Sequence, residues 1–323
     1  MTRGTPEMLI LHRHRCGRGF RYVDGEGSTI KDASTIARLK SLALPPAYVN
    51  VRYAADPAAH LQAVGEDAAG RLQYRYHPNW LRVREALKAH KLQNMAKSLP
   101  AIGRAVRRFL RGDPGDARHA AAAVVRLVAK TALRAGNDSY ARERGTRGAT
   151  TLLKSNIEID GGLVRLHFRG KGAKMVAREV RDPTLAVTCR NLLALPGRRL
   201  FQYRGSDGSL HPVRAADVNA FLREISGVRV SLKDFRTLVA SAGVMKTLSD
   251  APPAPTQLAR RTLLRDAIAA AAQDLANTPT VCRKSYVHEA VVAAFEKGEL
   301  QPSGARSLEG AAQALARVVA RHR

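Results

Sequence analysis

Residues 151–180 read TLLKSNIEIDGGLVRLHFRGKGAKMVAREV, and this stretch decides the fold because helical sequence lies on both sides of it. The triplet 160–162, Asp-Gly-Gly, is a hairpin-turn signature. It predicts antiparallel strands over 151–159 and 163–169, and a glycine-rich loop then leads to a third strand at 175–180. Apolar and polar residues alternate along the second strand, as they do when one face of a strand is buried. We therefore expect a three-stranded antiparallel sheet inserted among helices.

The sequence around this insert predicts mostly helices. Ala117–Arg134 is rich in Ala, Leu, Val and Arg, and Gly136 follows it as a C-terminal stop signal. Ser231 and Asp234 form a capping box that opens a helix running to about residue 248, with a proline-rich connector after it. Further helices are expected over 256–275, over a segment that carries Tyr286 towards Gly298, and over 307–321.

The first 90 residues have a different pattern. Short runs of aromatic and β-branched residues, bounded by Gly and Pro, predict strands at 20–23, 48–53 and 72–76, with a short helix at 34–42. The fold class that we expect is α+β. A small, sheet-dominated N-terminal domain occupies residues 1–90, and a mainly α catalytic domain with the three-stranded insert occupies residues 91–323.

The charge of the chain points to a polyanionic partner. Its 323 residues include 54 Lys and Arg against 27 Asp and Glu, a formal net charge of +27, while 45% hydrophobic residues are enough for a packed core. For a folded protein this basic, nucleic acid is the obvious partner. A ribosomal-type or membrane-surface basic protein is the alternative on composition alone.

Cysteine content and hydropathy favour an intracellular protein. Cys16, Cys189 and Cys282 are widely separated, so neither a zinc ribbon nor a disulfide framework is supported. The N-terminal apolar run is too short for a signal peptide, and no stretch approaches the ~20 apolar residues of a membrane helix. We expect a cytoplasmic, nucleoid-associated protein that does not bind membranes.

No cofactor or metal is expected. The loop at 170–172 superficially looks like a phosphate-binding loop, but the Walker pattern fails because Arg165 and Gly172 stand where it needs Gly and Ser or Thr. The sequence shows no close group of carboxylates of the kind that holds two metal ions. Chemistry on phosphate would then rest on side chains alone.

Four segments carry a possible active site. They are Leu133–Asn137 (LRAGN), Phe168–Gly172 (FRGKG), Leu232–Thr237 (LKDFRT), and Asn277–Pro279 (NTP) with Arg283–Tyr286 (RKSY). In this order they resemble the catalytic set of type IB DNA topoisomerases of the poxviral and bacterial kind. Two N-terminal runs, Leu44–Ala47 (LPPA) and Gly70–His77 (GRLQYRYH), resemble the DNA-clamping domain of that family. The resemblance extends from about residue 15 to about residue 298.

The resemblance implies a role for each matching residue. Tyr286 would attack the scissile phosphate and form a 3′-phosphotyrosyl bond, while Arg134 and Arg236 would bind the non-bridging oxygens through their planar guanidinium groups. Lys171 would protonate the leaving 5′-oxygen, and Lys233, three residues before Arg236 and so on the same helical face, would support that transfer. The activity implied is relaxation of supercoiled DNA by a monomer without ATP or metal.

Asn277 departs from the family pattern, in which most members have His before Thr-Pro. A protonated His donates a charged hydrogen bond, whereas Asn donates a neutral one. We expect Asn277 to face the phosphate with about half of the electrostatic benefit of His.

In the N-terminal domain the resemblance implies contacts with double-stranded DNA. Gln73, Tyr74 and Tyr76 would lie in the major groove, and the two tyrosines would project from one face of a strand. Arg71 and Arg75 would contact phosphates.

Two other readings remain open at this stage. Tyrosine site-specific recombinases share the chemistry, but they usually have His in place of Lys233 and an all-helical N-terminal domain. A non-catalytic, DNA-compacting basic protein is the second alternative. Taken singly, Tyr286 reads as a helix packing residue, and Asn277 reads as a helix C-cap before an N-cap at Thr278.

Overall fold

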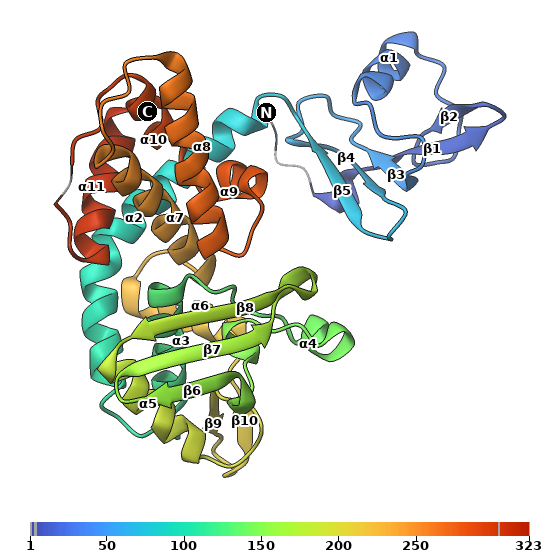
Figure 1. Ribbon diagram of the computed structural model, residues 1–323. Coiled ribbons are helices and arrows are strands. Elements are labelled where there is room, and N and C mark those ends of the chain that lie inside the picture. Colours follow the sequence, from blue (N-terminus) through green and yellow to red (C-terminus); the bar gives the residue numbers. More distant parts are fainter. Residues whose placement is uncertain (1, 3–4, 303, 323) are drawn as a thin grey trace. The chain divides into compact units, whose positions relative to one another are not determined.

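A computed structural model describes residues 2, 5–302 and 304–322. The chain forms two compact units, residues 1–86 (unit 1) and 87–323 (unit 2), which are described separately. The division lies close to the boundary predicted after residue 90. The α+β class is confirmed, because unit 1 is built on a sheet and unit 2 is a helical body with a small sheet (Figure 1).

Unit 1 is built on one antiparallel sheet in the order β2-β1-β3-β4-β5. Its core contains Tyr22, Leu39, Val51 and Tyr53, which are buried between the sheet and one helix. The Asp32 carboxylate caps that helix by accepting from the Thr35 N–H at 2.7 Å. The elements are β1 (Leu11–Cys16), β2 (Gly19–Val23), α1 (Ala33–Ser41), β3 (Val49–Tyr53), β4 (Leu61–Glu66) and β5 (Leu72–Tyr76), after a 3₁₀ turn at Pro6–Met8.

Strands β1 and β4 were not predicted. β1 reads LHRHRC, which local pattern assigns to no strand. Its place is set by Arg13, whose guanidinium donates to the carbonyls of Leu44, Pro45 and Tyr48 at 3.0, 3.0 and 2.8 Å. These partners lie more than thirty residues away, so tertiary contacts decide this strand.

Unit 2 is a helical body, and the long helix α2 enters it from unit 1. Its central helix is α3, in which residues 119–125, 127 and 128 are all buried. The helices are α2 (Trp80–Phe109), α3 (Ala117–Thr131), α4 (Asp138–Arg144), α5 (Pro183–Ala194), α6 (Ala215–Ser226), α7 (Leu232–Ser249), α8 (Gln257–Asp274), α9 (Pro279–Ser285), α10 (Glu289–Glu296) and α11 (Leu308–Arg321), with 3₁₀ turns at Ala149–Thr151, Lys154–Asn156 and Lys171–Ala173.

The predicted three-stranded sheet is confirmed. It consists of β6 (Ile157–Asp160), β7 (Leu163–Arg169) and β8 (Met175–Arg181), paired antiparallel in that order. Val164, Leu166 and Phe168 are buried, so the inward face of β7 joins the main core of unit 2. A small hairpin, β9 (Gln202–Arg204) with β10 (Leu210–Pro212), was not predicted.

Three predicted boundaries were wrong. The first strand begins at Ile157, because the N–H groups of Ala149 and Thr150 bond to the carbonyls of Arg134 and Ala135 at 2.7 Å and hold residues 149–156 in turns. Helix α3 ends at Thr131, not near Gly136, and Ala132 takes the left-handed C-cap conformation with φ of 50°. The helix expected around Tyr286 is broken into α9 and α10.

The most buried ion pair ties α3 to the insert. Asp182 is 3% exposed, precedes α5 as its N-cap, and accepts hydrogen bonds from Arg126 Nη2 at 2.8 Å and from the Leu185 N–H at 3.0 Å. Burial acts to raise the pKa of Asp182, but its hydrogen bonds from Arg126 and Leu185 outweigh burial, so the pKa lies below the ordinary carboxyl value. Within the part of the chain that the structure describes, no helix combines the length and apolar character needed to cross a membrane.

We predict that Asp182→Asn lowers the free energy of unfolding by about 3–5 kcal/mol, because the cap is kept while Arg126 loses its buried partner. The difference in free energy of unfolding between wild type and Asp182→Asn should be constant above about pH 5, and it should shrink as the pH falls through the lowered pKa of Asp182. Denaturant unfolding at several pH values measures this. Asp160→Asn, which removes a 72%-exposed carboxylate 3.5 Å from Arg165, is the control and should change the free energy by less than about 1 kcal/mol. An equal loss in both variants would contradict the prediction.

Candidate active site

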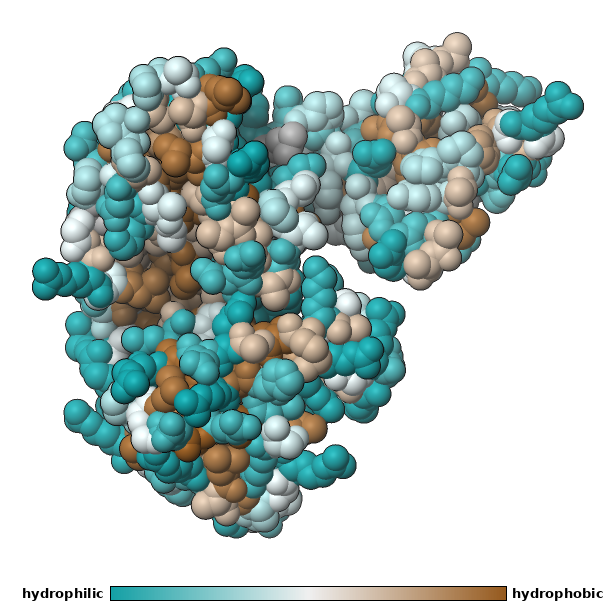
Figure 2. All heavy atoms as spheres, viewed as in Figure 1, coloured by the Kyte–Doolittle hydropathy of each residue, from teal (hydrophilic) through white to brown (hydrophobic). Residues whose placement is uncertain are grey.

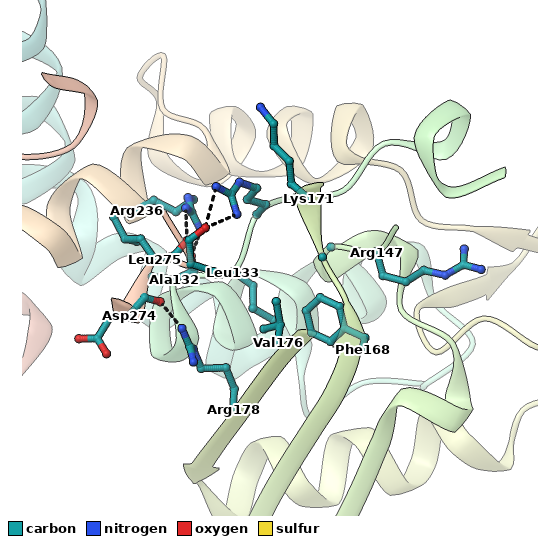
Figure 3. A pocket seen from close by; sticks show the side chains of 14 residues that line it. Ala132, Leu133, Arg147, Phe168, Lys171, Val176, Arg178, Arg236, Asp274 and Leu275 are labelled. Carbon is teal, nitrogen blue, oxygen red and sulfur yellow. Dashed lines mark hydrogen bonds between the residues drawn. The ribbon is translucent and has the colours of Figure 1, made fainter. Parts of the chain in front are cut away.

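In unit 2, four parts of the chain converge on one pocket. The end of α3, the β7–β8 hairpin tip, helix α7 and the end of α8 all contribute to its walls. Figure 3 shows Arg236, Lys171 and Arg178 around it. Arg134, Arg236 and Lys171, three residues that the sequence singled out, therefore lie in one pocket. Figure 2 shows hydrophilic residues over much of the face of unit 2 in view.

Arg236 is the most buried cation of this site, with 3% exposure. Its Nη1 donates to the Ala132 carbonyl and its Nη2 donates to the Leu275 carbonyl at 3.0 Å. Its Nε is buried and has no hydrogen-bond partner among the described residues. The guanidinium is thus held in place through both of its Nη atoms.

Arg134 is half-buried and is held by the chain that follows α8. Its Nη1 and Nη2 donate to the Ala276 carbonyl at 3.3 and 3.2 Å, and Nη2 also donates to Asn277 Oδ1. Because the amide oxygen of Asn277 faces Arg134, its amide nitrogen faces the other way. Asn277 Nδ2 is buried and lacks a hydrogen-bond partner in the described structure. It is therefore a second buried donor that no described residue satisfies.

Tyr286 lies in the break between α9 and α10, with φ of −128° and ψ of −27°. Its ring is half-buried, and Arg236 Cζ lies 5.1 Å from the ring centroid. Burial acts to raise the pKa of Tyr286, but the charges of Arg236, Arg134 and Lys233, with a hydrogen bond from Arg236, outweigh burial and leave the pKa below the ordinary tyrosine value. The site therefore makes this phenol easier to ionise.

The two lysines differ from the arginines in being exposed. Lys171 sits at the β7–β8 hairpin tip and contributes to the pocket wall. Gly170 before it has no room for a side chain, since an added Cβ would lie 2.7 Å from Val176, and Gly172 after it has φ of 73°. Lys233 is on the first turn of α7 and is exposed, whereas Arg236 one turn later is buried. The positive charge of Lys233 helps to lower the pKa of Tyr286.

In unit 1 the structure brings the two predicted tyrosines together. Tyr74 and Tyr76 lie on β5, an edge strand, and their exposed rings stack with centroids 6.3 Å apart. The row continues to Trp80, whose ring centroid is 5.8 Å from that of Tyr76.

The other three predicted DNA contacts of unit 1 are engaged within the protein. Asp67 accepts from Gln73 Nε2 at 2.9 Å and from Arg71 Nε at 2.9 Å. Arg75 Nη2 donates to the Ala43 carbonyl at 3.2 Å. Alternation along the strand places Gln73 and Arg75 on the face opposite the tyrosines.

Two pocket residues were missed by the sequence analysis. Arg178 lies on β8, and Arg147 follows α4, with its side chain pointing away from Arg236 (Figure 3). The available signal for Arg178 was its place between Val176 and Val180 on the inward face of a strand, where a charged residue needs a partner. Among the described residues, no group of three or more His, Cys, Asp or Glu side chains is placed to hold a metal ion.

Comparison with known proteins gives matches over both units. The family model for the catalytic core of eukaryotic DNA topoisomerase I matches residues 79–303, and the model for the N-terminal domain of bacterial DNA topoisomerase IB matches residues 19–67. The DNA topoisomerase 1B of Acanthamoeba polyphaga mimivirus is 30% identical over 287 residues, which cover 86% of this chain and 84% of that protein.

The lowered pKa of Tyr286 can be tested directly. The ultraviolet titration of the protein minus that of Tyr286→Phe isolates this phenol, which should ionise below the ~10 of free tyrosine. Lys233→Gln removes one of the charges and should move that ionisation to higher pH. Lys246→Gln, on the same helix but paired with Asp250, is the control and should leave it in place. Ionisation at or above ~10 in the unmodified protein would contradict this account of the site.

Proposed function

The chain belongs to the type IB DNA topoisomerase family and is a DNA topoisomerase, and from this premise we propose that it relaxes supercoiled DNA through a covalent bond to Tyr286, without ATP or metal. The observation that carries the proposal is the position of Arg236, which lies 5.1 Å from the Tyr286 ring with a buried, unused Nε donor. A phosphate bound there would meet its nucleophile and its charge stabilisation in one place.

The proposed step combines Tyr286, which lies against Arg236, with the pocket residues Lys171, Arg134 and Arg236. Tyr286 Oη bonds to phosphorus and releases its phenolic proton to solvent, while the bond between phosphorus and the 5′-oxygen breaks. Lys171 donates a proton to that oxygen, which leaves as a 5′-hydroxyl. Arg236 and Arg134 bind the non-bridging oxygens, where charge accumulates in the transition state.

Asn277 contributes through its amide. Its oxygen is occupied by Arg134, so Nδ2 donates to the phosphate in this proposal. This is a neutral hydrogen bond, about half as strong as the charged one a protonated His would make. The amide oxygen of Asn277 also accepts from Arg134 and so holds this arginine in place. A protonated His has no acceptor and could not make that bond.

Religation reverses the step. The phosphotyrosyl bond keeps the energy of the broken diester, so the 5′-hydroxyl can displace Tyr286 again without a nucleotide. Between the two steps the free end swivels about the intact strand. The five-stranded sheet of unit 1 distinguishes this chain from tyrosine recombinases with their all-helical N-terminal domain. We place the enzyme in the cytoplasm at the nucleoid, as a monomer acting on double-stranded DNA.

Unit 1 supplies further DNA contacts in this proposal. Tyr74 and Tyr76 offer a flat aromatic surface to base edges and methyl groups in the major groove. Arg75 and Arg71 are exposed and add phosphate contacts. Gln73 reads bases only on exchanging its bond to Asp67 for one to DNA.

The central experiment is relaxation of plasmid DNA in EDTA without nucleotide. Positive and negative supercoils should both relax, and a denaturing gel should show protein bound to the 3′ end of a nicked strand. Tyr286→Phe should bind duplex DNA normally and form no adduct, because the attacking oxygen is gone. Tyr203→Phe, a partly buried tyrosine on β9, is the control and should retain activity. Relaxation that needs Mg²⁺ or ATP, or normal adduct from Tyr286→Phe, would refute the mechanism.

The contacts of unit 1 make a separate prediction about salt. Arg75→Ala should weaken duplex binding and reduce the slope of log affinity against log salt by about 0.9, the value for one lost phosphate contact. Tyr76→Ala should weaken binding with little change in slope, since base contacts release no counterions. Each variant is the control for the other. An unchanged slope in Arg75→Ala would mean that this arginine does not contact phosphate.

A further inference from the structure

The end of helix α8 gathers three arginines from three different elements. Its last residues and the two that follow present four consecutive carbonyls, at Gln273, Asp274, Leu275 and Ala276. Arg236 from α7 takes the third carbonyl, and Arg134, after α3, takes the fourth. Arg178 from β8 donates through Nη2 to the first two, at 2.8 Å to Gln273 and 2.7 Å to Asp274, and Figure 3 draws the bond to Asp274.

This convergence has a simple physical cause. The last carbonyls of a helix have no partner inside the helix, and they carry the negative end of its dipole. Guanidinium groups satisfy both needs, since they are charged donors with several N–H groups. Two of the three arginines here are those assigned to the phosphate, so the third is attached to the same support.

Arg178 connects this support to the hairpin that carries Lys171. It lies on β8, three residues beyond Met175, where β8 begins, and pairs in register with Leu166 of β7. At the tip the Lys171 side chain is exposed, although Gly170 before it packs closely against Val176. The strands, and what holds them, therefore decide where the lysine amine can reach.

We propose that Arg178 is a positioning residue for Lys171. By anchoring β8 to the end of α8, it fixes the distance between the Lys171 amine and the phosphate that Arg134 and Arg236 bind. This inference rests on the proposed function, since it assumes that Lys171 protonates the leaving oxygen. Arg178 itself does not touch the reacting atoms.

Changing the leaving group of the substrate distinguishes positioning of Lys171 from general support of the fold by Arg178. In the normal step the bond between phosphorus and O5′ breaks and the oxygen takes a proton from Lys171. When sulfur replaces that bridging oxygen, the same bond breaks but a thiolate leaves, and a thiol pKa near ~8.5 means that no proton is needed. A defect confined to proton delivery disappears with the sulfur substrate.

The experiment is single-turnover cleavage of two duplexes, one normal and one with a 5′-bridging sulfur at the scissile position. Arg178→Ala should cleave the normal duplex about tenfold to a hundredfold more slowly, a part of what general acid catalysis contributes, and the sulfur duplex within about threefold of wild type. Arg178→Lys, which keeps one charged donor, should recover part of the loss. Arg181→Ala removes the same charge from the far end of β8 and should match wild type on both duplexes.

Two results would overturn the inference. The first is a normal rate for Arg178→Ala on the oxygen duplex. The second is an equal loss on both duplexes, which would mean that Arg178 supports the whole pocket. If Arg178→Ala does not fold, the same comparison of duplexes is made with Arg178→Lys. Lys171→Ala tests the proposed function separately. It should cleave the oxygen duplex slowly and the sulfur duplex at nearly the wild-type rate, whereas an equal loss on both duplexes would show that Lys171 is not the general acid.

Discussion

Burying a guanidinium without partners costs several kcal/mol, and this constraint organises unit 2. Arg236 is 3% exposed, and its charge is tolerable because the Ala132 and Leu275 carbonyls accept from it. Both carbonyls are available only because α3 and α8 end at that place. The left-handed conformations of Ala132 and Ala276, with φ of 50° and 48°, turn the chain there. The ends of two helices thus create the polar lining that a buried cation needs.

The same arrangement explains why Tyr286 lies in a helix break. Helix α9 ends at Ser285 and α10 begins at Glu289, so residues 286–288 lie between the two helices and contact α7. Ser241 on α7 holds this segment: its hydroxyl donates to the Tyr286 carbonyl at 2.7 Å and accepts from the His288 N–H at 3.0 Å. Because α7 also carries Arg236, one helix holds both the backbone of Tyr286 and the cation beside its ring. Helix α11 packs against α7 and α10, and its Leu315 and Val319 are buried in the main core of unit 2.

Local sequence was sufficient where local physics decides the structure. The alternation along β7 predicted that strand, and the capping box of Ser231 and Asp234 predicted the start of α7. Both predictions were possible because strand burial and helix capping act within a few residues. Strand β1 was not readable, since Arg13 and its distant carbonyls establish it. The break at Tyr286 was also missed, because Ser241 lies 45 residues away. The motifs singled out Arg134, Lys171 and Arg236, which line one pocket. The shared support of Arg134, Arg178 and Arg236 at the end of α8, however, depends on tertiary contacts.

In the proposed reaction, cations that are held in place before the substrate arrives can stabilise the transition state without first reorganising. Water around a developing charge must reorient during the reaction, whereas arginines tied to carbonyls already point to the place where the charge will appear. The helix end that holds them is itself weakly negative, so each guanidinium keeps its position without being neutralised by a carboxylate. Asp274 lines the pocket, but its exposed carboxylate forms no ion pair with Arg134, Arg178 or Arg236 in the described structure. A carboxylate that paired with them would also repel the phosphate. Neutral carbonyls satisfy them and leave their charge for the DNA, which is why the support is built from a helix terminus.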